Sequence, residues 1–141
     1  MSRYVCGAAS AVVTSDSGVT VARVSGVVTA ASAGDLIARI SARARLGGAL
    51  ANVVFYDSAL MAVTHDRLLA ASRVSSGSTP TAIVASADQM PMFTSYAAAA
   101  MGAGILKAAF ATEAEARRWA SQQAEVRAYW LSLRRALRSE P

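Results

Sequence analysis

The sequence has 141 residues, of which 54% are hydrophobic and 16% charged, and its net charge is +5. This length predicts one domain with a proper core, and the apolar content excludes a largely disordered chain. One cysteine excludes an internal disulfide and suits a reducing compartment, so a cytoplasmic protein is expected. No stretch reaches the ~18 uninterrupted apolar residues of a membrane span, and one cysteine with one histidine cannot make a zinc site of these ligands.

Two β-rich segments come first, at residues 4–14 and 19–29, and the Ser15-Asp16-Ser17-Gly18 stretch between them has turn composition. Two strands joined by about four turn residues predict an antiparallel hairpin. A helix follows, with Ser32 as its expected cap, and Gly47-Gly48 ends it.

The rest of the chain alternates strands with helices. Strands are predicted at residues 50–56, 81–87 and 105–111, and helices at residues 65–73, 88–101 and 112–138. The order is therefore ββαβαβαβα, and alternation of this kind requires parallel pairing through crossovers. We expect a single α/β domain over residues 1–141, with a mixed sheet of four or five strands, an N-terminal hairpin and a long C-terminal helix.

The stretch VVFYDS (53–58) combines a buried-strand pattern with a carboxylate and a hydroxyl at its end. In open α/β sheets, ligands bind at the carboxyl ends of strands. Asp57 and Ser58 are therefore the candidate regulatory turn. The simpler alternative is that Asp57 caps the next turn through backbone N–H groups.

Three stretches match a known family: the strand that ends at Asp57-Ser58, TAIVASAD (81–88) and GILKAAFATEAEARRWA (104–120). They resemble the STAS / SpoIIAA-like family, also called STAS/SEC14-like, over about residues 19–122. In the last stretch the matching positions are Gly104, Phe110, Glu113, Ala116 and Trp119. The resemblance implies a non-enzymatic regulatory or protein-interaction module.

The best-known members of this family are anti-sigma-factor antagonists, which carry Asp-Ser-Ser-Gly at the strand end and are phosphorylated on the second serine. Alignment of Asp57-Ser58 with the first two positions puts Ala59 at the phosphoserine and Leu60 at the glycine. The resemblance therefore implies a module without a working phosphoserine switch.

The alternative is a SEC14-like protein that binds a small hydrophobic ligand or lipid. A soft apolar stripe on the helix at residues 88–101 would then line a pocket or an interface; its members are Met90, Met92, Phe93 and Tyr96. The same stripe suits a core or a dimer face.

Two enzyme-like or phosphoacceptor interpretations are less favoured. A receiver-like phosphoacceptor at Asp57, with Ser86 and Lys107, lacks a helix between its first strands and the usual paired acids. A hydrolase built on Ser58, His65 and Asp66 lacks the glycines that flank a nucleophile elbow. No catalytic residue, metal or cofactor is predicted.

The last helix would be roughly 40 Å long, and the family-like domain is complete near residue 122. Residues 123–141 are therefore expected to form a basic amphipathic extension. Its apolar side is an expected oligomer interface, formed by Val126, Tyr129, Trp130, Leu133 and Leu137. We expect a homodimer or larger assembly and a protein partner, and not a nucleic-acid partner, because aromatic and basic residues do not interleave elsewhere.

Overall fold

The computed structural model describes residues 1–75 and 79–139. Within these ranges the elements are β1 (Ser2–Cys6), β2 (Ala9–Asp16), β3 (Val19–Thr29), α1 (Ala30–Leu46), β4 (Ala51–Ala62), α2 (His65–Ser75), β5 (Thr81–Val84), α3 (Met90–Gly102), β6 (Lys107–Phe110) and α4 (Glu113–Ser139). The predicted hairpin of β2 with β3 and the later alternation of strands and helices are confirmed.

The strands form one six-stranded sheet in the order β1-β2-β3-β4-β5-β6. The pairs β1–β2 and β2–β3 are antiparallel, and the pairs from β3 to β6 are parallel. The mixed α/β sheet is thus as expected, but the expected number of four or five strands is wrong. The short strands β1 and β6 form the two edges of the sheet.

The extra strand arises from a tight turn inside the predicted first strand, at Gly7-Ala8. Gly7 has a positive φ of 63°, which glycine adopts without steric cost. The turn packs against Gly26, where an added Cβ would lie 2.2 Å from the carbonyl oxygen of Ala8. The N–H of Val27 also donates to that oxygen, at 3.1 Å. A glycine distant in sequence therefore makes room for the turn.

Helix α1 starts earlier than predicted, because Thr29 rather than Ser32 is its N-cap. The N–H of Ser32 donates to Thr29 Oγ1 at 3.2 Å, and the N–H of Thr29 donates to Ser32 Oγ at 2.8 Å. This reciprocal pair is a capping box in which Ser32 occupies the N3 position. Helix α3 begins at Met90, two residues later than predicted, with Pro91 in its first turn.

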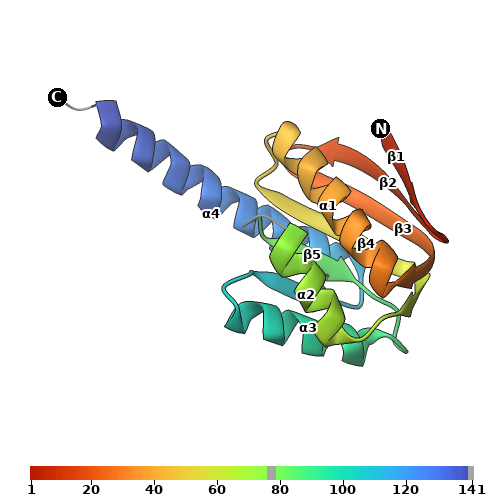
Figure 1. Cartoon of the computed structure of the whole chain (residues 1–141). Coiled ribbons are helices and arrows are strands. Elements are labelled where there is room, and N and C mark those ends of the chain that lie inside the picture. Colours follow the sequence, from red (N-terminus) through yellow and green to blue (C-terminus); the bar gives the residue numbers. More distant parts are fainter. Residues whose placement is uncertain (76–78, 140–141) are drawn as a thin grey trace.

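The helices cover the two faces of the sheet unequally. Helices α1, α2 and α3 lie on one face and α4 lies on the other (Figure 1). The core under the three helices contains large side chains that are fully buried, among them Leu36, Leu68, Ile83 and Phe93. The core under α4 is smaller and rich in alanine, with Ala51, Ala82, Ala116 and Ala120.

Candidate functional site

Asp57 and Ser58 do not end their strand, which is a correction to the sequence prediction. Strand β4 continues to Ala62. Arg23 of β3 pairs with Phe55 of β4, whereas Ser25 pairs with Ser58, so β4 carries one extra residue in a β-bulge. The bulge lets the strand continue past two exposed polar residues.

The turn that joins β4 to α2 lies further along the chain, at Val63-Thr64. The carbonyl of Thr64 accepts the N–H of Leu68 at 3.0 Å, and Thr64 is exposed. Its hydroxyl, as a hydrogen-bond donor to Asp66, is the main reason that the pKa of that carboxyl is lowered. In the described residues no hydrogen bond joins Ser58, His65 and Asp66, so the triad is not assembled.

The apolar residues of α3 belong mainly to the core. Phe93 and Tyr96 are buried, and the ring of Phe93 stacks on Tyr56 with centroids 4.9 Å apart. Met90 and Met92 are partly buried against the same core. Tyr96 also lines the cavity described below.

A row of buried polar side chains crosses the sheet beneath the helices. Thr20 pairs with Asn52, Asn52 with Thr81, and Thr81 with Lys107, so the row spans four adjacent strands. All four are buried, and neither Thr20 Oγ1 nor Asn52 Oδ1 has a hydrogen-bond partner among the described residues. Sequence reasoning missed this row because each member is a single polar residue, and only the strand register brings the four together.

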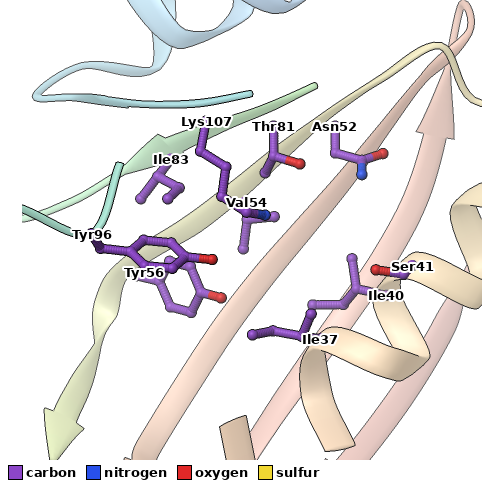
Figure 2. Close-up of a pocket in the computed structure, with 10 residues that line it drawn as sticks. All are labelled: Ile37, Ile40, Ser41, Asn52, Val54, Tyr56, Thr81, Ile83, Tyr96 and Lys107. Atoms are coloured by element: carbon purple, nitrogen blue, oxygen red, sulfur yellow. The ribbon is translucent and has the colours of Figure 1, made fainter. Parts of the chain in front are cut away.

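A cavity of about 30 Å³ lies beside this row, between the sheet, α1 and α3. Figure 2 shows Asn52, Thr81 and Lys107 extending from the sheet toward the space that the hydroxyls of Tyr56 and Tyr96 also approach. The lining residues are Ile37, Ile40, Ser41, Asn52, Val54, Tyr56, Thr81, Ile83, Tyr96 and Lys107.

Lys107 is the only lysine of the chain, and it is only 6% exposed. Burial lowers the pKa of its ammonium from 10.5 to about 8. Its Nζ lies 5.8 Å from the centroid of the Tyr96 ring, and in the described residues it makes no hydrogen bond or ion pair.

The two tyrosines of the cavity are neutral hydrogen-bonding groups at physiological pH. Burial raises the pKa of Tyr96 to about 12, although its hydrogen bond with Ser72 opposes the shift. Burial, and to a smaller extent the nearby Tyr96, raises the pKa of Tyr56 further. The arrangement therefore combines one cation with neutral polar groups.

The first half of α4 packs on the sheet. Ala116 and Ala120 are fully buried, and the ring of Trp119 lies 5.9 Å from that of Phe110. Arg23 of β3 donates to Glu113 at 2.9 Å, which ties the start of the helix to the sheet. These contacts hold α4 along the strands as far as Ala124.

The second half of α4 leaves the sheet and extends beyond it (Figure 1). Its predicted interface residues are between 36% and 65% exposed; they are Val126, Tyr129, Trp130, Leu133 and Leu137. All residues from 128 to 139 are exposed, so no part of the chain that the structure describes buries the apolar side of this segment.

The sequence matches no protein-family model, and it matches no curated protein. The structure is similar to that of an anti-sigma factor antagonist from Mycobacterium paratuberculosis, with a TM-score of 0.59 and 17% sequence identity. The match covers 80% of this chain and 94% of that one. The chain has a STAS-like fold.

The STAS-like fold confirms what the sequence resemblance implied about architecture. At this identity the likeness concerns the fold alone. In the part of the chain that the structure describes, no helix is long and apolar enough to span a membrane. The same residues contain no group of three or more side chains that suits a metal ion.

Proposed function

We propose that this protein is a non-enzymatic regulatory module of the STAS / SpoIIAA-like kind, and that it acts as a homodimer joined through the distal half of α4. The observation that carries the proposal is the exposed apolar side of that half-helix. A domain of this size does not need so long a helix for its own core. An exposed apolar patch of this kind usually marks an interface.

The spacing of the exposed residues suits a second helix. Val126, Trp130, Leu133 and Leu137 follow one another at intervals of four, three and four residues. This is the heptad pattern of a seam between two helices. Burial of Trp130 and the leucines would contribute on the order of several kcal/mol before the entropy cost of association is subtracted.

The flanking residues favour a parallel arrangement of the two helices. In the heptad register above, Tyr129 flanks one side of the seam and Arg134 the other. A parallel pair brings Tyr129 of one copy beside Arg134 of the second, where a cation–π contact forms. An antiparallel pair would instead bring arginines of the two copies together, and like charges repel.

The regulatory part of the proposal rests on the STAS-like fold and on two features of the candidate sites that disfavour other functions. The protein with the similar structure is described as an anti-sigma factor antagonist, which acts on another protein. A serine switch at Asp57-Ser58 is not favoured, because Ser58 pairs within the sheet and the following Ala59 is buried. The cavity that Tyr96 lines does not favour a lipid carrier, because its volume of about 30 Å³ has no room for an acyl chain.

Light scattering coupled to size-exclusion chromatography tests the dimer. Wild-type protein at tens of micromolar is expected to have twice the mass of the chain. Trp130→Glu with Leu133→Glu should give a folded monomer, and so should truncation after Glu125, which keeps the packed Ala124. The matched control is Ser132→Glu with Ser139→Glu, which adds the same charge on the opposite side of the helix and should remain dimeric. A monomeric wild type would refute the proposal.

A further inference from the structure

We propose that the cavity at the end of the polar row binds a small carboxylate, with Lys107 and Asn52 as its principal ligands. The first observation is the isolation of the Lys107 ammonium. It is buried beneath α3 and makes no hydrogen bond or ion pair in the described residues. A buried ammonium without a counter-charge is costly, and a bound anion would supply that charge.

The second observation is the chemistry of the cavity wall. The amide of Asn52 and the hydroxyls of Tyr56 and Ser41 are neutral groups that can donate to an anion. The hydroxyl of Thr81 donates to the carbonyl of Thr79 at 3.2 Å, so it is already engaged. Among the described residues no carboxylate, arginine or histidine lines the cavity, and its titratable side chains are Lys107, Tyr56 and Tyr96. The described wall therefore offers one cation and several donors to an anion, and the amide of Asn52 must present its NH₂ group rather than Oδ1 to it.

The size of the cavity limits what enters. The cavity has a volume of about 30 Å³, and about 10–15 Å³ of such a volume holds one enclosed water, so there is room for about two. This space suits the carboxylate of formate or acetate. It does not suit a branched acid, whose methyl groups would meet Ile37 and Ile40.

Because Lys107 is the only lysine of the chain, labelling of lysine observes this side chain alone. Protein labelled with ¹³C and ¹⁵N in lysine alone has a single set of lysine side-chain signals, and their pH titration reports the pKa of Lys107. When sodium acetate replaces sodium chloride at constant ionic strength, that pKa should rise by about one unit, since a tenfold binding preference for the charged form moves a pKa by about one unit. Trimethylacetate, which has the same charge and greater bulk, should leave it unchanged.

Thermal unfolding gives an independent readout. Acetate should raise the melting temperature of the wild type, and Lys107→Met should abolish that rise. Arg67→Met is the matched control, because it removes an exposed cation and should keep the full effect. An unchanged pKa of Lys107 in acetate would overturn the proposal, and so would acetate stabilisation that persists in Lys107→Met. If Lys107→Met does not fold, the titration of the wild type alone decides.

Discussion

The two faces of the sheet are built from different side chains. Beneath α1, α2 and α3 the core uses large residues such as Leu36 and Phe93, and it also holds the polar row. Beneath α4 the contact is made largely by alanines, among them Ala116 and Ala120. Alanines let a helix lie close to a sheet but bury little apolar area. The comparison teaches that the three-helix face buries most of the large apolar side chains, whereas the distal half of α4 leaves its apolar side chains exposed.

The largest expected effect comes from removing a large side chain from the core beneath α1, α2 and α3. Phe93→Ala should lower the free energy of unfolding by about 3–5 kcal/mol, because Phe93 is fully buried. Trp119→Ala, on the α4 face, should cost about 2 kcal/mol or less, because Trp119 is only partly buried. Urea denaturation of both variants measures the difference. Equal losses would contradict the contrast between the faces.

Lys107 of the polar row should make the free energy of unfolding depend on pH. Below pH 8 Lys107 is protonated in both the folded and the unfolded chain, and the folded state bears the cost of its burial. Above the folded pKa of about 8 the folded protein holds neutral Lys107, whereas the unfolded chain keeps its lysine charged up to about pH 10.5. The free energy of unfolding should therefore rise with pH in this window, by at most about 3 kcal/mol.

The tyrosines reverse this trend at higher pH. The pKa values of Tyr56 and Tyr96 are raised in the folded state, so above pH 10 the unfolded chain loses protons first and stability falls. Lys107→Met should remove the rise between pH 8 and 10 and leave the later fall. Urea unfolding across this pH range tests both statements. If the free energy of unfolding still rises with pH in Lys107→Met, another group causes the rise.

Overpacking tests whether the α4 face needs small residues. Ala116→Leu should cost about 1–3 kcal/mol, because Ala116 is fully buried against the sheet. Ala128→Leu, on the exposed half of the same helix, is the matched control and should have little effect. If Ala116→Leu were neutral, α4 would be more loosely packed than its buried alanines indicate.

The smallest expected effect concerns salt. The distal half of α4 carries Arg134, Arg135 and Arg138, and the proposed parallel dimer places both copies' sets at the same end of the paired helices, within reach of long-range repulsion. Salt near 1 M shortens the screening length from about 10 to about 3 Å, so it should tighten the dimer a few-fold. Analytical ultracentrifugation measures this change. Weaker association in high salt would indicate that the arginines pair with acids across the interface.

Patterns local in sequence predicted most of the fold. The turn at Asp16-Ser17-Gly18, the β-rich sequence of β3 and the Gly47-Gly48 pair that ends α1 each act within a few residues, so they could be predicted without tertiary information. The turn that separates β1 from β2 could not be predicted from local sequence patterns. It depends on Gly26, which is distant in sequence from the turn that it accommodates.

The candidate sites were harder to predict for the same reason. The carboxylate and hydroxyl of Asp57-Ser58 looked like a strand end, but a bulge against β3 extends the strand to Ala62. The polar row depends on a register shared by four strands, which no single segment reveals. In contrast, the exposed side of distal α4 followed from helical spacing and length, and its role as an interface stays a prediction.

The short edges of the sheet have a consequence for aggregation. β1 has five residues and β6 has four, so each edge offers few unpaired backbone groups to another sheet. β1 also carries Arg3, and a charge on an edge strand discourages edge-to-edge pairing. A chain with 54% hydrophobic residues is thereby protected against uncontrolled sheet growth. If copies of the chain associate, short edges of this kind disfavour pairing strand by strand without limit and favour a closed assembly of fixed size formed through other surfaces.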